Sequence, residues 1–219
     1  MAIAYLNGSW QPIEKAQVPV LDKGFMFGDG VYEVIPVYQS KPFAVEAHLT
    51  RLSKSLGAMR IPVPMSEEDW LTLFRVGISK ADLTAAIIYV QVTRGVADVR
   101  SHVYGDSNPT VLITISPKPP TKSKRKFSLV VKEDFRWSRG YIKTISLAAN
   151  TLVRNEAIAE GYDDAVLTRN GILTEASSSN VFIVKDGVIA TPVANNYLLH
   201  GVTRSQVLNL ARTEGLRFE

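Results

Sequence analysis

A proline-rich stretch near the middle of the chain constrains the fold more than any other feature of the sequence. Residues 116–124 read Ser-Pro-Lys-Pro-Pro-Thr-Lys-Ser-Lys and follow a strand-like run at 111–115. Proline fixes φ and has no backbone N–H, so neither a helix nor a central strand can run through this stretch. We therefore expect two lobes in the 219-residue chain: an N-terminal α+β domain over 1–116, a linker over 117–126 and a C-terminal domain over 127–219.

The same stretch accounts for the basic character of the chain. The formal net charge is +4, from 25 Lys and Arg against 21 Asp and Glu. Five basic side chains lie between 118 and 126, and without them the balance becomes 20 against 21. No aromatic residue is interleaved with them, so a solvated linker is favoured over a nucleic-acid-binding patch. The five are Lys118, Lys122, Lys124, Arg125 and Lys126.

Composition excludes several classes of protein. The absence of cysteine excludes disulfide scaffolds, thiolate metal sites and cysteine nucleophiles, and three histidines are too few to favour a metal site. Apolar residues make up 46% of the chain, which excludes disorder as the main state. The longest apolar runs have the length of strands, and the N-terminus lacks the basic and apolar regions of a signal peptide. We therefore expect a cytoplasmic protein without a membrane partner.

Local patterns predict mixed strands and helices in both lobes. A capping box of Ser66 and Asp69 predicts the start of one helix. Strands and helices do not alternate strictly, which favours an α+β fold. Turn pairs of the Asn-Gly or Asp-Gly type predict hairpins at 7–8, 170–171 and 186–187. The expected strands cover 2–6, 10–13, 31–38, 87–92, 111–115, 127–131, 165–168, 172–173, 181–184 and 188–190, with another starting at 216; the expected helices cover 46–59, a segment from 66, 147–160 and 203–214.

Lys143 is the first residue whose surroundings suggest chemistry. It lies in Tyr-Ile-Lys-Thr-Ile at 141–145, and we consider the case in which this segment is a strand. The lysine would then share a face with Tyr141 and Ile145. Burial there disfavours the ammonium form, and a neutral amine is what Schiff-base chemistry requires. The alternative, which this segment alone favours, is an edge lysine with its head in water.

Two further segments carry groups that suit a ligand with a ring nitrogen and a phosphate. Glu175 precedes the run 177–180, Ser-Ser-Ser-Asn; the carboxylate could hold a ring nitrogen while the hydroxyls donate to anions. Gly201-Val202-Thr203-Arg204 leads into a helix with Thr203 as the expected N-cap, and the free N–H groups of a helix start attract phosphate. The alternatives are a polar turn and simple capping.

Three cationic side chains complete the candidate set. Arg51 adjoins the apolar stripe of the 46–59 helix, so its head could turn inward to a phosphate; snorkelling to solvent is the alternative. Arg100 and His102 alternate in a loop after the 87–92 strand. Such a pair would suit a carboxylate, and a solvated loop is the alternative.

The order of these motifs resembles one family. Segments 27–34, Lys143, 174–182 and 201–204 together resemble the pyridoxal-phosphate enzymes of the branched-chain aminotransferase-like fold, the class IV or fold-type IV family. The resemblance implies pyridoxal 5'-phosphate as cofactor, a homodimer, and two domains: a smaller N-terminal α/β sandwich-like domain and a C-terminal pseudo-barrel. Family members usually continue for roughly another sixty residues, so we expect the pseudo-barrel to be truncated.

Within the family the chain resembles the D-amino-acid aminotransferases most. The Glu-x-Ser-Ser-Ser-Asn stretch and the Arg100-x-His102 pair carry that resemblance. It implies ping-pong transamination between a D-amino acid, such as D-alanine or D-glutamate, and a 2-oxo acid, through a lysine internal aldimine. The alternatives are a branched-chain L-amino-acid aminotransferase, an aminodeoxychorismate lyase, and a non-enzymatic binder that acts through the basic cluster.

The resemblance also implies a role for each candidate residue. Lys143 would form the internal aldimine and move the substrate α-proton, and Glu175 would pair with the pyridine nitrogen. The substrate carboxylate would be held by Tyr32, Arg100 and His102. The other cofactor-binding residues would be Arg51, Val202 and Thr203 at the phosphate, Leu199 under the ring, and Ser177, Ser178, Ser179 and Asn180 along the pocket.

Overall fold

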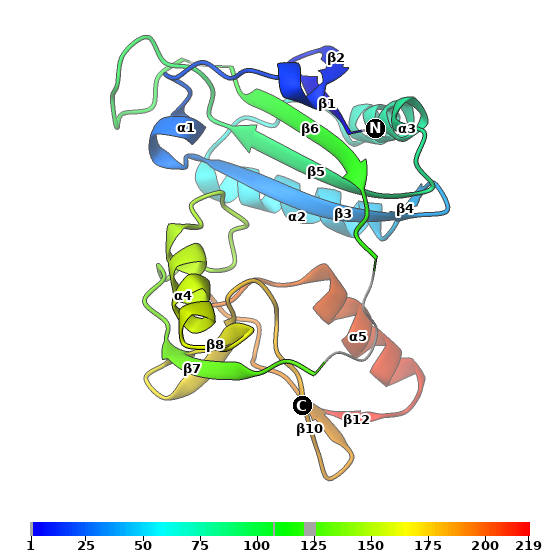
Figure 1. Ribbon diagram of the computed structural model, residues 1–219, viewed down its shortest axis with the longest axis vertical. Coiled ribbons are helices and arrows are strands. Elements are labelled where there is room, and N and C mark those ends of the chain that lie inside the picture. Colours follow the sequence, from blue (N-terminus) through cyan, green and yellow to red (C-terminus); the bar gives the residue numbers. More distant parts are fainter. Residues whose placement is uncertain (1, 107, 121–125) are drawn as a thin grey trace. The chain divides into compact units, whose positions relative to one another are not determined.

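The computed structural model describes residues 2–106, 108–120 and 126–219 (Figure 1). The chain divides into two units: Met1–Thr121 with Ile142–Ser146, and Lys122–Tyr141 with Leu147–Glu219. The sequence analysis ended the first domain at 116 and began the second at 127. In the structure the first unit extends to Thr121 and also includes 142–146, the short segment that carries Lys143. The expected linker also begins too early, since strand β6 (Thr110–Pro117) includes Pro117. Most of the basic cluster, at 122, 124 and 125, lies outside the described residues.

The first unit is built on a six-stranded sheet with the order β2-β1-β6-β5-β3-β4. The long strands β3 (Gly30–Tyr38) and β5 (Ala85–Thr93) pair antiparallel along their whole length, from Gly30 opposite Thr93 to Tyr38 opposite Ala85. Strands β1 (Ile3–Leu6) and β2 (Ser9–Pro12) form the expected hairpin, and β4 (Lys41–Pro42) caps one edge. The Asn7-Gly8 turn is confirmed, with positive φ at both residues.

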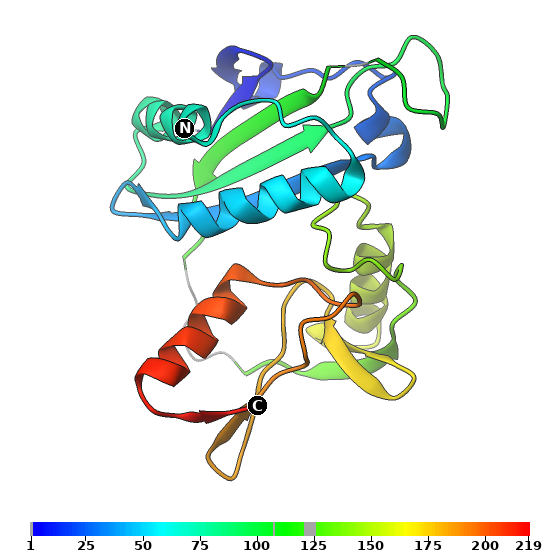
Figure 2. The same cartoon turned by 180° about the vertical axis from the view of Figure 1, so that it is seen from behind.

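Two helices cover one face of this sheet (Figure 2). Helix α2 (Val45–Met59) packs on β3 through Leu49, Leu52 and Leu56, and helix α3 (Glu67–Ala81) packs on β1 and β6 through its buried aromatic residues. The capping box of Ser66 and Asp69 begins α3 as predicted. Because side chains alternate along a strand, the odd positions of β3 from 31 to 37 are buried beneath the helices and Tyr32 lies on the opposite face. Short elements η1 (Ile13–Lys15) and α1 (Lys23–Phe27) precede β3.

The segment Ile142–Ser146 runs along the edge of β3 and is not a regular strand. Its Lys143 carbonyl accepts from the N–H of Tyr32 at 2.9 Å, and the Ile145 N–H donates to the Gly30 carbonyl at 3.0 Å. One isolated bridge joins Thr144 to Val31. The segment is therefore not the strand considered above, since edge hydrogen bonds to β3 fix it without building a ladder. They also explain why it belongs to the first unit.

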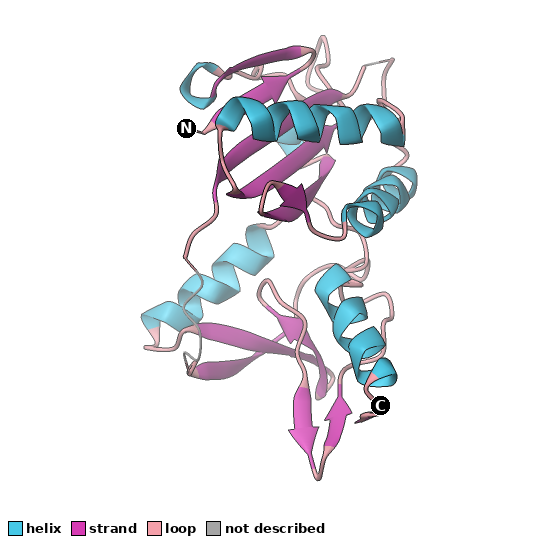
Figure 3. Cartoon of the chain, turned by 90° about the vertical axis from the view of Figure 1, so that its right-hand side faces the viewer, coloured by secondary structure: helices cyan, strands magenta, loops and turns pink. Residues whose placement is uncertain are grey.

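The second unit contains two small sheets, each with one parallel pair bridged by a helix (Figure 3). The first has the order β7-β8-β9, and helix α4 connects its parallel strands. A core of Val153, Ala157, Ala165 and Leu167 lies between that helix and the sheet. The second sheet has the order β10-β11-β12, with α5 as its crossover. The elements are β7 (Leu129–Glu133), α4 (Ala148–Ala159), β8 (Asp164–Arg169), β9 (Ile172–Ala176), β10 (Ile183–Lys185), β11 (Val188–Ala190), α5 (Val202–Thr213) and β12 (Arg217–Phe218).

Helix α5 begins differently from the prediction. Its N-cap is Gly201, and no side chain caps it, so the assignment of Thr203 as N-cap is wrong. The amphipathic pattern of this helix predicts that Val207, Leu208 and Leu210 lie inside, but Leu210 is 61% exposed. The sequence predicts that Gly215 ends this helix, and Gly215 follows it with a φ of +66°, the left-handed conformation typical of a glycine at that position. No helix in the described ranges is long and apolar enough to cross a bilayer.

Candidate functional site

Lys143 is held from both sides within the first unit. Its backbone N–H donates to Ser55 Oγ of α2 at 3.2 Å, and its carbonyl accepts from β3. The neighbours Ile142 and Thr144 are buried, while Lys143 is half-buried. The ammonium nitrogen lies 4.1 Å from the centroid of the Tyr32 ring. The lysine is therefore fixed at its backbone, and its amine lies over an aromatic face.

A second tyrosine supports Tyr32. The rings of Tyr32 and Tyr89 have centroids 5.8 Å apart, and the Tyr89 hydroxyl donates to Gln91 Oε1 at 2.6 Å. Burial, with a smaller contribution from Tyr32, raises the pKa of Tyr89 to about 12. Tyr89 therefore stays neutral at physiological pH and supports Tyr32 by packing and not by charge.

Arg51 forms a two-pronged ion pair that the sequence did not predict. Its Nε and Nη2 donate to the two carboxylate oxygens of Glu33 at 2.7 and 2.8 Å. His48 Nδ1 lies 2.7 Å from Oε2 of the same carboxylate. Burial alone would raise the pKa of Glu33, but hydrogen bonds from Arg51 and His48 outweigh it and the pKa is lowered. Glu33 is therefore an anion that fixes one edge of the Arg51 guanidinium.

Arg100 and His102 lie on the surface of the first unit, and both contact one aromatic ring, that of Phe27. The Arg100 guanidinium carbon lies 5.1 Å from the Phe27 ring centroid, and the His102 ring centroid lies 5.0 Å from it. Both side chains are exposed. Their loop is tied to α1, since Lys23 Nζ donates to the Val103 carbonyl at 2.5 Å. The structure thus brings the two predicted cations together as neighbours on Phe27.

Arg94 anchors the start of the same loop. Its Nε and Nη2 pair with the Asp29 carboxylate at 2.6 and 3.0 Å, and it donates to the carbonyls of Met59 and Arg60. The Tyr104 ring lies 3.5 Å from its guanidinium carbon. A nearly fully buried arginine therefore joins the base of the loop to the end of α2.

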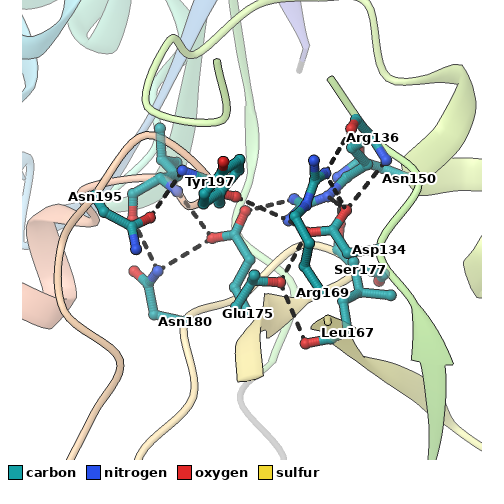
Figure 4. A network of polar contacts seen from close by, with 12 residues as sticks. Asp134, Arg136, Asn150, Leu167, Arg169, Glu175, Ser177, Asn180, Asn195 and Tyr197 are labelled. Carbon is teal, nitrogen blue, oxygen red and sulfur yellow. Dashed lines mark hydrogen bonds and ion pairs between the residues drawn. The ribbon is translucent and has the colours of Figure 1, made fainter. Parts of the chain in front are cut away.

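Glu175 forms the centre of a polar cluster in the second unit (Figure 4). Its Oε2 accepts from the Leu199 N–H at 3.1 Å and from Asn180 Nδ2 at 3.2 Å. Its Oε1 accepts from Arg136 Nη1 at 2.5 Å. Burial raises the pKa of Glu175, and Arg136 pulls in the opposite direction without reversing the shift. Three predicted cofactor residues, Glu175, Asn180 and Leu199, are thus joined directly.

Asp134 and Arg136 are functional candidates that the sequence analysis missed. The Asp134 carboxylate is fully buried and accepts from Arg136 Nε and Nη2, both at 2.9 Å, and from Thr174 Oγ1 at 2.8 Å. Burial alone would raise the pKa of Asp134, but hydrogen bonds from Arg136 and Thr174 lower it. The available signal was local: an Asp-x-Arg pattern directly after the apolar β7 strand.

The serine run places its three members differently. Ser177 is buried, and its hydroxyl has no hydrogen-bond partner among the described residues. Ser178 is exposed and accepts from Arg154 at 3.2 Å, while the Ser179 carbonyl accepts from the Ala176 N–H. A buried hydroxyl without a partner is costly, so Ser177 is a candidate donor to a ligand.

The N-terminus of α5 lies close to this cluster. A Cβ added to Gly201 would lie 2.1 Å from Asn180 Oδ1, so only glycine fits there. Asn180 also donates to the Leu199 carbonyl at 2.8 Å. Val202 is buried and Thr203 is exposed. The first turn has no side-chain cap, and such N–H groups attract anions.

Comparison with solved structures identifies the class of protein. The branched-chain amino acid aminotransferase of Escherichia coli is similar to this chain with a TM-score of 0.87 and 26% identity, over 99% of this chain and 75% of that one. A hypothetical aminotransferase from Mycobacterium tuberculosis, solved in a pyridoxal-phosphate-bound form, has a TM-score of 0.87 at 24% identity, over 99% of this chain and 80% of that one. The fold is that of the fold-type IV aminotransferases.

Sequence comparison identifies the family. The model of amino-transferase class IV matches residues 30–219, and the chain belongs to that family. It is 36% identical to a D-alanine aminotransferase of Listeria monocytogenes over 93% of this chain and 72% of that protein. It is 34% identical to a D-alanine aminotransferase of Staphylococcus aureus over 98% of this chain and 77% of that protein. The chain is a pyridoxal-phosphate-dependent aminotransferase, and the expected cofactor is confirmed.

The residues of the second unit fit this cofactor. A pyridine nitrogen suits a buried carboxylate, and Glu175 supplies one. A phosphate suits an uncapped helix start, which α5 supplies, and the buried Ser177 hydroxyl adds a donor in need of an acceptor.

Proposed function

We propose that this chain transfers the amino group of D-amino acids to a 2-oxo acid in a ping-pong reaction. The observation that carries the proposal is the pair Arg100 and His102, which both lie against the Phe27 ring. An arginine and a histidine on one surface can hold a carboxylate while leaving its side chain to be selected elsewhere. The D-alanine aminotransferases to which the chain is similar support the same choice of substrate hand.

Lys143 is the proposed catalytic base and acid. The cofactor, when bound, supplies an electron-accepting ring that stabilises the negative charge left after an α-proton is removed. The Lys143 amine would take that proton at Nζ and return it in the second half of the reaction. Its backbone hydrogen bonds to β3 and Ser55 fix the Cα from which the side chain extends.

Glu175 would accept the N–H of the ring nitrogen and keep it protonated, with Leu199 beneath the ring. The phosphate would be bound by the Val202 and Thr203 amides, the Thr203 hydroxyl and Arg51. The serines and Asn180 would line the pocket.

The substrate carboxylate would be bound by Tyr32, Arg100 and His102. We further propose a cytoplasmic homodimer. The family implies amino acids and 2-oxo acids as substrates, and the choice between D- and L-amino acids is part of the proposal.

The experiment is a cofactor absorption spectrum of the full chain before and after an amino donor is added. D-Alanine should convert the bound cofactor to its amino form and release pyruvate, and L-leucine should not. Conversion by L-leucine instead would refute the D-specific proposal. It would favour a branched-chain aminotransferase, the second candidate, which the similarity to the Escherichia coli enzyme supports.

A further inference from the structure

Arg136 joins two buried carboxylates that lie on different segments of the second unit. Its Nη1 donates to Glu175, while Nε and Nη2 donate to the two oxygens of Asp134. A guanidinium is planar, so a carboxylate that holds two of its nitrogens fixes the plane of the whole group. The direction in which Nη1 points toward Glu175 is therefore set by Asp134.

Asp134 is itself held in a way that leaves it little freedom. Thr174 Oγ1 donates to it at 2.8 Å, and the Arg136 backbone N–H donates at 3.1 Å. Arg169 Nη2 lies 3.5 Å from Asp134 Oδ1, donates to the Arg136 carbonyl at 2.6 Å, and belongs to a guanidinium stacked on Tyr197. A carboxylate this deeply buried is stable only when it is fully hydrogen-bonded, and here these bonds also fix its orientation.

The other oxygen of Glu175 is held independently. Leu199 and Asn180 donate to Oε2, and Arg136 donates to Oε1. Donors at both oxygens define the plane of the Glu175 carboxylate. If the Arg136 donor moves, the carboxylate can rotate about its bond to Cγ while it keeps the contacts at Oε2.

We propose that Asp134 is a positioning residue for recognition of the cofactor's ring nitrogen. It fixes Arg136, and Arg136 fixes the carboxylate plane of Glu175. The inference rests on the proposed role of Glu175 at the ring nitrogen. It adds that two residues outside the family-like motifs determine how well that nitrogen is recognised.

The test compares two ligands that differ only at the ring nitrogen. The full chain, freed of cofactor, is titrated with pyridoxal phosphate and with its carbocyclic analogue, in which C–H replaces the nitrogen. Binding is followed by tryptophan fluorescence. The Kd of the carbocyclic analogue divided by the Kd of pyridoxal phosphate measures recognition of the nitrogen alone. A purely structural defect would weaken the binding of both ligands equally and leave this ratio unchanged. The wild-type ratio should be about ten to a hundred, the range for a hydrogen bond to a charged group.

Asp134→Asn should lower this ratio about tenfold while it changes the Kd of the carbocyclic analogue far less. Arg136→Lys should do the same, because an ammonium group cannot bind both carboxylates in one plane; this variant decides the question if Asp134→Asn does not fold. Asp163→Asn is the matched control: its carboxylate accepts from the Ser128 N–H, away from the cluster, and the wild-type ratio should persist.

The outcomes separate the two proposals. A wild-type ratio near one would refute the role of Glu175. A wild-type ratio of ten or more that Asp134→Asn and Arg136→Lys leave unchanged would refute the positioning role alone. A ratio that rises in Asp134→Asn would also refute it, because loss of a nearby negative charge by itself favours the Glu175 anion.

Discussion

The ion pair between Glu33 and Arg51 gives a prediction whose size follows from its geometry. In Glu33→Gln the side chain keeps its shape but offers one acceptor oxygen and one NH₂ group. Arg51 donates to both oxygens of the wild-type carboxylate, at 2.7 and 2.8 Å. In either amide orientation one N–H of Arg51 therefore faces another donor. The guanidinium also loses its counter-charge.

The expected cost is about 3 kcal/mol of unfolding free energy, the low end of the range for breaking a buried ion pair. The low end applies because the Arg51 side chain is 13% exposed and can recover some hydration. The assay is urea denaturation of the cofactor-free chain at pH 7, followed by circular dichroism and by tryptophan fluorescence; Trp10 and Trp70 lie in the first unit. Glu68→Gln, on the exposed first turn of α3, should cost less than about 0.5 kcal/mol.

The pH dependence gives a second readout of the same pair. The pKa of Glu33 is lowered in the folded state, so its stabilising contribution is present above the unfolded-state value near 4.5. That contribution is lost as the pH falls through the lowered value. The gap between wild type and Glu33→Gln should therefore shrink in acid. A gap below about 1 kcal/mol at pH 7, or one that widens in acid, would refute this account of the pair.

Three further predictions concern the proposed reaction. Lys143→Ala should abolish transamination while the circular dichroism spectrum is unchanged; turnover near the wild-type rate would remove Lys143 from its role. Arg100→Ala should raise the KM for D-alanine about tenfold or more with little change in cofactor affinity, and equal losses in both would argue for a structural role. Gly201→Ala should weaken cofactor binding, because the new Cβ would lie 2.1 Å from Asn180 Oδ1. The control is Gly57→Ala, because a Cβ added at Gly57 would have no neighbouring atom within 4 Å. This variant should leave cofactor binding unchanged and stabilise α2 by about 1 kcal/mol.

Features that depend on neighbouring residues were predictable from the sequence. The capping box at Ser66, the Asn7-Gly8 hairpin and the glycine after α5 all formed as expected, because each is determined within a few residues. The same holds for the helix at 46–59, whose apolar spacing defines the face that packs on the sheet. The ordered motifs were also sufficient to identify the family and its cofactor.

Features that depend on distant residues were not predictable in the same way. The conformation of 142–146 is set by hydrogen bonds to β3, more than a hundred residues earlier, so its own composition does not define it. Glu33 lies within a run typical of a buried strand, and only the α2 side chains at 48 and 51 explain its charge. The Asp-x-Arg pattern at 134–136 does not by itself indicate a function, because its link to Glu175, about forty residues later, forms only in the folded chain.

The attachment of 142–146 to β3 has a consequence for the order of synthesis. The first unit is discontinuous in sequence, since its last segment is separated from Thr121 by part of the second unit. During translation, the β3 edge near Val31 stays uncovered until residue 146 has left the ribosome. An exposed strand edge is a site for pairing with other chains. A fragment that stops at 121 lacks the segment that pairs with this edge, so we expect it to self-associate more readily than one supplied with residues 142–146.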